Sequence, residues 1–240
     1  MNRACLCCVG SCSFLAGAAS GVPLLHESFE SPVVTNGSGY VVYGAGAVLS
    51  TSVADWAVLA DSVDLARTVS GVFAPADGAQ AVDMTGSPGA GAIRTGLALD
   101  PGATYFLSFR YARNASASSP AMTAEVTTTG PEPLLRAEVT HADQYNAYRR
   151  FVGSFVADAA EATLTFTSLT GGNAGIALDD VRVFEACVGD FDRDGYATVN
   201  DLLAYLGAFR TGEPDADVSG DGSVNVNDLL AYLGAFRAGC

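Results

Sequence analysis

Two acidic stretches near the carboxyl terminus have the residue types and the spacing of a calcium-binding loop. Calcium takes about six to eight oxygen ligands, and a loop of about twelve residues supplies them from positions 1, 3, 5, 7, 9 and 12, with glycine at position 6 for a sharp turn. Gly195 and Gly222 occupy position 6. The predicted ligands are Asp190, Asp192, Asp194, the Tyr196 carbonyl, Thr198 and Asp201 in the first loop, and Asp217, Ser219, Asp221, the Ser223 carbonyl, Asn225 and Asp228 in the second. The alternative is a pair of solvated acidic turns that bind no metal.

An identical segment follows the start of each loop. Residues 199–210 and 226–237 have the same twelve letters, 27 residues apart, so this part of the chain is an internal duplication. Their apolar residues recur with a helical period, and we expect one side of the first helix to carry Val199, Leu202, Leu203, Leu206 and Phe209. Gly207 and Gly234 lie inside these helices, where glycine costs about 1 kcal/mol relative to alanine. Either the two helices approach closely there, or the glycines mark fraying helix ends.

The duplicated loop–helix unit resembles the type I dockerin family over residues 188–240. Its position 12 holds Asp201 and Asp228, where an EF-hand has a longer glutamate. The resemblance implies a small α-helical domain that binds two Ca²⁺ ions and docks onto a cohesin-type protein or a surface scaffold. Loop positions 10 and 11 lack the Ser/Thr pair of the best-known dockerins, which leaves the partner open. Because the helices are identical, we expect two alternative docking orientations, and the first loop, with four carboxylates against three, is predicted to bind calcium more tightly.

Residues 1–19 are predicted to be a secretory signal peptide, because Arg3 precedes an uncharged run that ends in small residues. This run is shorter than the roughly 20 residues that span a bilayer, and a retained anchor is the alternative. We therefore expect a secreted or cell-surface protein without a transmembrane span in its mature chain. Four of the six cysteines lie in this segment. The other two, Cys187 and Cys240, flank the duplication and predict a disulfide in an oxidising compartment, with two free thiols as the alternative.

The charge of the chain argues against nucleic acid as a partner. Twelve basic residues, all arginine, stand against 26 acidic ones, and a net charge of -14 repels phosphate. The hydrophobic content of 49% is enough to build a core, so intrinsic disorder is not expected.

Residues 24–186 have the period of β-strands. Alternate positions are apolar in residues 105–111 and again in residues 162–168, and turn signals such as Asp100-Pro101-Gly102 separate the runs. About 160 residues of this kind predict a β sandwich. The alternation changes phase at Asp179-Asp180, which predicts a β-bulge.

Several short landmarks of this segment together are similar to the exported choice-of-anchor C family, which is akin to plant cell-wall proteins of a family of unknown function. They are residues 27–30 (Glu-Ser-Phe-Glu), 55–56 (Asp-Trp), 76–83 (Ala-Asp-Gly-Ala-Gln-Ala-Val-Asp), 102–105, 109–114 and 177–181. The resemblance implies a galactose-binding-like jelly roll, extracellular placement, contact with carbohydrate or cell-wall polysaccharide, and a variable C-terminal anchoring device. The dockerin-like segment takes that last place here.

Sugar recognition needs aromatic faces and planar polar groups. The predicted carbohydrate contacts are Arg113, Asn114, Tyr145, Tyr148 and Arg149, with ordinary exposed residues as the alternative. Trp56 is the only tryptophan, and we expect it in the core rather than in a sugar platform. Glu30 and Asp179, near the first and last strands, either share a structural calcium or cap turns; because two carboxylates offer too few oxygens, we favour the caps.

The predicted protein is therefore an exported, non-catalytic one: a β jelly-roll sandwich over residues 24–186 that binds carbohydrate, joined to a dockerin-like domain over residues 188–240. Two other functions stay open. Glu125 and Glu138 are candidates for a paired-carboxylate glycan hydrolase, since sequence spacing does not give their separation. A purely structural surface or matrix protein would bind nothing small.

Overall fold

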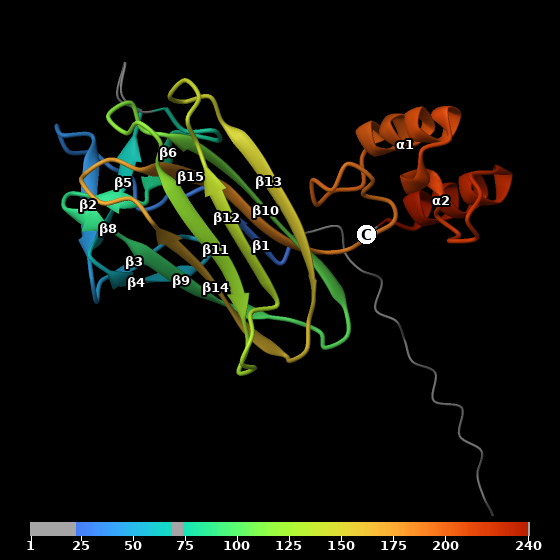
Figure 1. The fold of residues 1–240 in the computed structure, drawn as a ribbon, viewed down its shortest axis with the longest axis horizontal. Coiled ribbons are helices and arrows are strands. Elements are labelled where there is room, and N and C mark those ends of the chain that lie inside the picture. The colour runs from blue at the N-terminus through green and yellow to red at the C-terminus, as the bar shows by residue number, and fades with distance from the viewer. Residues whose placement is uncertain (1–22, 69–73, 240) are drawn as a thin grey trace, which may run out of the picture.

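Two β-sheets packed face to face form the larger part of the molecule, and two helices form the smaller part (Figure 1). The computed structural model describes residues 23–68 and 74–239. The predicted signal peptide and Cys240 lie outside these described residues.

The first sheet has seven strands in the order β13-β10-β15-β6-β5-β2, with β1 beside β15. Their bounds are β1 (Leu25–Glu27), β2 (Tyr40–Gly44), β5 (Ser62–Arg67), β6 (Gln80–Asp83), β10 (Thr104–Arg113), β13 (Arg149–Val156) and β15 (Ile176–Glu185). The second sheet has the order β12-β11-β14-β9-β4-β3. Its strands are β3 (Val48–Ser50), β4 (Asp55–Ala60), β9 (Ala92–Ala98), β11 (Ala121–Thr127), β12 (Leu135–Thr140) and β14 (Glu161–Ser168). The short strands β7 (Thr85–Gly86) and β8 (Gly89–Ala90) pair with each other as a separate two-stranded sheet.

The core lies between the sheets and is built from alternate residues of each strand, as the sequence predicts. In β10 the buried set is Tyr105, Leu107, Phe109 and Tyr111, and in β14 it is Ala162, Leu164, Phe166 and Ser168. Phe109 and Phe166 meet edge to face across the core, with ring centroids 5.1 Å apart. The predicted β sandwich is confirmed.

Trp56 belongs to this core and is fully buried. Its ring packs between Phe29 and Phe166, and its indole N–H donates to the buried carboxylate of Glu27 at 3.3 Å. The expectation that Trp56 is a core residue is therefore confirmed.

The predicted β-bulge lies in β15. Ser108 of β10 stands opposite Arg182, but Arg110 stands opposite Asp179, so the pairing shifts between these positions. Asp180 is the extra residue of the bulge, and its backbone φ is 48°. Asp179 and Asp180 both bind groups on the side of the first sheet that faces away from the core, which we call the outer face.

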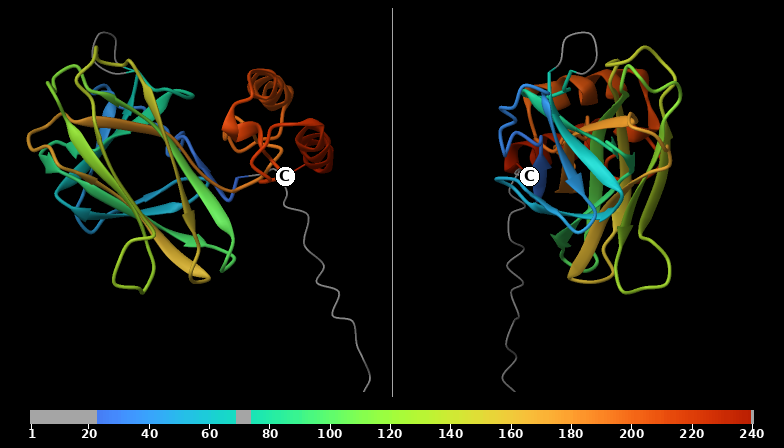
Figure 2. Two further views of the ribbon diagram at one scale, coloured as in Figure 1. Left: turned by 45° about the vertical axis from the view of Figure 1, so that its right-hand side comes forward. Right: turned by 90° about the vertical axis from the view of Figure 1, so that its left-hand side faces the viewer.

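The helices α1 (Val199–Thr211) and α2 (Val226–Ala238) lie next to each other beside the sandwich (Figure 2). They pack through a small aromatic cluster. Tyr205 and Tyr232 are stacked with ring centroids 3.8 Å apart, and Phe191 meets both rings edge-on.

The apolar side predicted for the first helix is only partly buried. Leu202 and Phe209 contact the cluster, whereas Val199, Leu203 and Leu206 are exposed. The reason is that the position-12 aspartate is fully buried against its loop, so the residues one and two turns further on face inward with it.

The glycines inside the helices are in open space. A side chain added at Gly207 or Gly234 would meet nothing within 4 Å, which excludes the first of the two alternatives, a close approach of the helices at these positions. Within the described residues, no helix combines the length and the apolar character needed to cross a membrane.

Candidate functional site

The two acidic loops have the same internal scaffold. In the first, Asp190 accepts the backbone N–H groups of Asp194 and Gly195, each at 2.9 Å. In the second, Asp217 accepts those of Asp221 at 3.1 Å and Gly222 at 2.7 Å. Each loop thus folds its backbone around the carboxylate at position 1.

The position-12 aspartates close the loops in the same way. Asp201 accepts the backbone N–H groups of Asp192 at 2.9 Å and Thr198 at 2.7 Å. Asp228 accepts those of Ser219 at 2.9 Å and Asn225 at 2.8 Å. Thr198 and Asn225, predicted as position-9 ligands, are also the N-caps of α1 and α2, so loop and helix are held as one unit. These ligand sets remain predictions, but the structure brings each set into one loop.

The first loop is the more acidic site. Carboxylate oxygens of Asp190, Asp192 and Asp194 all lie within 4.8 Å of one another. Burial raises the pKa of Asp190 to about 6, and burial together with the charge of Asp194 raises the pKa of Asp192. In the second loop, backbone N–H donors lower the pKa of Asp228 to about 2. Three crowded carboxylates with hard oxygen donors suit a divalent cation such as calcium.

The segment after Cys187 lies beside the end of α2. The Tyr232 hydroxyl donates to the Gly189 carbonyl at 3.3 Å, and a Cβ built on Gly189 would stand 3.3 Å from the Phe236 Cα. The predicted Cys187–Cys240 disulfide falls on a residue outside the described ranges, so it stays a prediction.

Most of the predicted sugar contacts hold a loop rather than line an open surface. The Arg113 guanidinium donates to the carbonyls of Asp143 and Ala117, and Arg149 forms an ion pair with the Asp143 carboxylate. The Tyr148 ring packs on small residues of the outer face, and burial raises the pKa of its hydroxyl. Tyr145 is half-buried in the same loop.

Asn114, the remaining predicted contact, lines a polar cavity of about 210 Å³ on the outer face. The cavity lies over β2, β5 and β6 and the loops beside them, and its lining is Gly39, Tyr40, Asp64, Ala66, Asp83, Ser87, Asn114, Ser116, Asn173 and Ala174. Among its members, only Asn114 was found from the sequence.

Two buried carboxylates form the floor of this cavity. Asp64 and Asp83 stand directly opposite each other on β5 and β6, an arrangement that is unfavourable for two like charges. Burial raises the pKa of Asp83 to about 7 and also raises that of Asp64. Asn114 donates to Asp83 at 2.7 Å, and the Ser87 hydroxyl donates to Asp64 at 3.0 Å. Aspartate is rare inside strands, and this was the available sequence signal.

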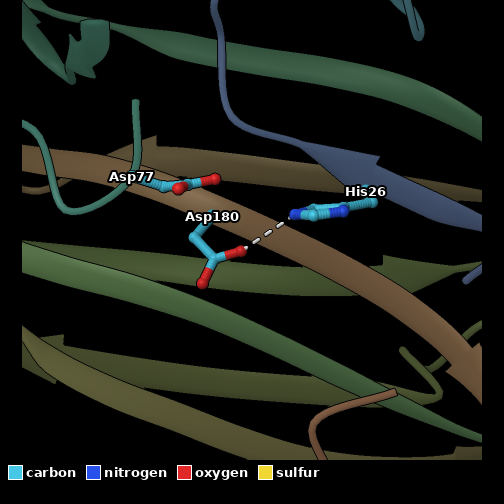
Figure 3. Close-up of side chains that lie close together, drawn as sticks. All are labelled: His26, Asp77 and Asp180. Carbon is cyan, nitrogen blue, oxygen red and sulfur yellow. Dashed lines mark hydrogen bonds and ion pairs between the residues drawn. The ribbon is translucent and has the colours of Figure 1, made fainter. Parts of the chain in front are cut away.

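A second acidic group on the outer face contains His26, Asp77 and Asp180 (Figure 3). The His26 ring points to the Asp180 carboxylate, with Nε2 at 3.2 Å from Oδ1. Asp180 also pairs with Arg110 at 3.1 Å and Arg182 at 2.7 Å. Because two guanidinium groups already balance this carboxylate, the group is better suited to an ion-pair network than to a metal ion.

Glu30 and Asp179 clamp one loop by hydrogen bonds. Glu30 accepts the backbone N–H groups of Ala79 and Gln80, and Asp179 accepts those of Ala76 and Asp77, all between 2.7 and 2.9 Å. This is the turn-capping arrangement expected in preference to a shared calcium.

The carboxylates considered for hydrolysis lie on the second sheet. Glu125 pairs with Arg136 at 3.0 Å, and Glu138 stands opposite Thr123 rather than opposite Glu125. Glu125 is therefore neutralised by a guanidinium rather than set against a second carboxylate.

Neither a protein-family model nor a curated protein matches this chain. Solved structures similar to it include a family 61 carbohydrate-binding module (TmCBM61) in complex with β-1,4-galactotriose, with a TM-score of 0.45 and 14% identity over 55% of this chain and 88% of that one. They also include a xylan-binding domain, CBM22-1, of Paenibacillus barcinonensis Xyn10C, with a TM-score of 0.40 and 13% identity over 70% and 96%. A family 35 carbohydrate-binding module from Clostridium thermocellum gives a TM-score of 0.40 and 18% identity over 61% and 98%. At this level of agreement, the likeness says nothing about what this chain binds.

Proposed function

We propose that this chain is an exported, non-catalytic binding protein with two activities. The sandwich binds a saccharide in the polar cavity of its outer face. The C-terminal module binds two calcium ions and docks onto a cohesin-type protein or surface scaffold. The observation that carries the first activity is the cavity itself, and the observation that carries the second is the duplicated loop scaffold.

The cavity has the chemistry that a sugar needs. A pyranose offers hydroxyl groups that require directed donors and acceptors, and an apolar ring face that stacks on an aromatic side chain. Asp64 and Asp83 are acceptors, the Asn114 amide is donor and acceptor, and Tyr40 is a half-exposed ring at the rim, 38% exposed. A volume of about 210 Å³ suits a short saccharide rather than a long chain.

The cavity and the loop that contains Tyr145 are different places, so substitutions can tell which of the two binds the saccharide. Tyr40→Ala and Asn114→Ala should each weaken retention on an immobilised polysaccharide panel, whereas Tyr145→Ala, in the loop outside the cavity lining, serves as the matched control. Loss of retention in Tyr145→Ala with normal retention in Tyr40→Ala would place the site in the loop instead. Release of reducing sugar by the wild-type chain would contradict the non-catalytic assignment.

The proposed docking surface is an apolar stripe that occurs once on each helix. Leu203 is 63% exposed on α1, and its counterpart Leu230 is 64% exposed on α2. The flanking members of the two stripes are Val199 and Leu206 on α1, and Val226 and Leu233 on α2. Each residue is exposed to nearly the same extent as its counterpart on the other helix. Two equal stripes support docking in either of two orientations.

Single and double substitutions test this surface. Leu203→Asp and Leu230→Asp should each retain capture by an immobilised cohesin-type receptor in calcium, and the double variant should lose it. Leu169→Asp, at an exposed position of the sandwich, is the control. Full capture by the double variant would refute the docking surface.

A further inference from the structure

The first acidic loop contacts the sandwich on the outer face of the first sheet (Figure 2). The Arg150 guanidinium, on β13, donates to the backbone carbonyls of Asp192, at 3.4 Å, and Arg193. The Arg182 guanidinium, on β15, donates to the carbonyl of Asp194 at 2.8 Å. Three consecutive carbonyls of the loop are thus bound by two arginines of the sheet.

Side chains complete this contact. The Tyr196 hydroxyl lies 3.2 Å from His26 Nδ1, and the Arg182 guanidinium lies over the Tyr196 ring at 5.5 Å from its centroid. Arg193 reaches back to the sheet and lies over the Phe106 ring at 5.3 Å. The network around Asp180 therefore serves to hold the C-terminal module.

The second loop has no residues of this kind. The positions equivalent to Arg193 and Tyr196 are Gly220 and Ser223, 27 residues later in the chain. The twelve letters of the two helices are identical, so the difference between the repeats is concentrated in the loops. The helix stripes stay exposed in both repeats, because the contact uses the loop and not the helix faces.

We propose that calcium in the first loop fixes the C-terminal module on the sandwich, while calcium in the second loop serves only the module. This inference rests on the proposed calcium binding. Residues 192–194 are contacted from two sides. The carboxylates of Asp192 and Asp194 are predicted calcium ligands, and the backbone carbonyls of Asp192, Arg193 and Asp194 accept hydrogen bonds from the two arginines. Calcium that orders the loop therefore favours its hydrogen bonds to the arginines, and those hydrogen bonds favour calcium binding.

One effect opposes this coupling. The positive charge of Arg150 attracts the carboxylate of Asp192, so the calcium-free, negatively charged loop is also attracted to the sheet. That attraction acts at long range and is screened at physiological salt over about 8 Å. The hydrogen bonds to the carbonyls instead require the loop to have one conformation. The coupling that results is a free energy shared by two sites, so it is reciprocal: docking of the module strengthens calcium binding at the first loop by the same factor as calcium strengthens docking.

The experiment measures calcium affinity and shape on the full mature chain. Isothermal titration with calcium is carried out on wild type, Arg150→Ala and Tyr196→Phe, with Arg136→Ala, an exposed arginine of the second sheet, and Ser223→Ala, at the second-loop position equivalent to Tyr196, as matched controls. We expect each interface variant to weaken one of the two binding events, on the order of tenfold for Arg150→Ala, and to leave the other unchanged. Small-angle scattering should show the wild type as one rigid body in calcium and as two mobile bodies in chelator.

The possible results are distinct. Unchanged affinity in both interface variants, or equal weakening of both binding events, would overturn the inference, as would a wild type whose scattering is the same with and without calcium. Arg150→Ala and Tyr196→Phe act through different contacts, so a folding defect in one leaves the other as the test. If the wild type binds no calcium at all, the proposed calcium function fails together with this inference. If the wild type binds calcium but the interface variants do not change its affinity, only this inference fails.

Discussion

Gly195 and Gly222 form a matched pair for testing the two loops. Both sit at position 6, with φ of 93° and 85°, in the region that disfavours any residue with a side chain. An alanine at either position should therefore destabilise its turn by about 1–2 kcal/mol. Since about 1.4 kcal/mol is a factor of ten in an equilibrium constant, each variant should weaken calcium binding at its own loop by roughly tenfold.

The two substitutions differ in what the added methyl group meets. At Gly195 it would stand 3.3 Å from the Phe184 ring and 3.4 Å from Pro23, whereas at Gly222 it would meet nothing within 4 Å. Gly195→Ala should therefore also loosen the module on the sandwich, and Gly222→Ala should not. Calcium titration combined with small-angle scattering measures both effects. Equal affinities for wild type and both variants would refute the turn argument, and equal loosening by both would refute the assignment of the contact to the first loop.

Three further predictions concern stability of the full chain. Tyr205→Phe should be neutral or stabilising in urea unfolding followed by circular dichroism, because the buried Tyr205 hydroxyl has no hydrogen-bond partner among the described residues. Tyr232→Phe should lower the free energy of unfolding by about 1 kcal/mol, because it loses a hydrogen bond to a backbone carbonyl. A larger loss for Tyr205→Phe than for Tyr232→Phe would contradict this. Gly207→Ala and Gly234→Ala should each stabilise by about 1 kcal/mol, since both positions are open; a lower melting temperature would count against it. Burial raises the pKa of Asp83 from 3.8 to about 7, so the folded state holds this proton more tightly than the unfolded state, and stability should fall as pH rises from about 4 to 7; a pH profile unchanged by Asp83→Asn would show otherwise.

The strands and the loops could be predicted because their causes are local. Alternation of apolar residues identified the buried side of β10, and the change of phase at Asp179-Asp180 identified the bulge. The glycine at position 6 of each loop takes the left-handed conformation that the spacing requires.

The buried side of the helices and the polar cavity could not be predicted, because their causes are not local. Hydrophobicity favoured a stripe that includes Leu203, but the buried position of Asp201 turns Tyr205 inward instead. The pairing of Asp64 with Asp83 depends on the register between two strands, which no pattern within either strand reveals. The contact of Arg150 with the first loop likewise joins residues 42 positions apart in the chain.

The central claim is that each acidic loop binds one calcium ion through its position-12 aspartate. Isothermal titration and helix content by circular dichroism are to be measured on the full mature chain of wild type, Asp201→Ala, Asp228→Ala and the double variant. We predict two ions for wild type, one for each single variant and none for the double variant, with calcium raising helix content in step. Two ions bound by the double variant, or none bound by the wild type, would contradict the account.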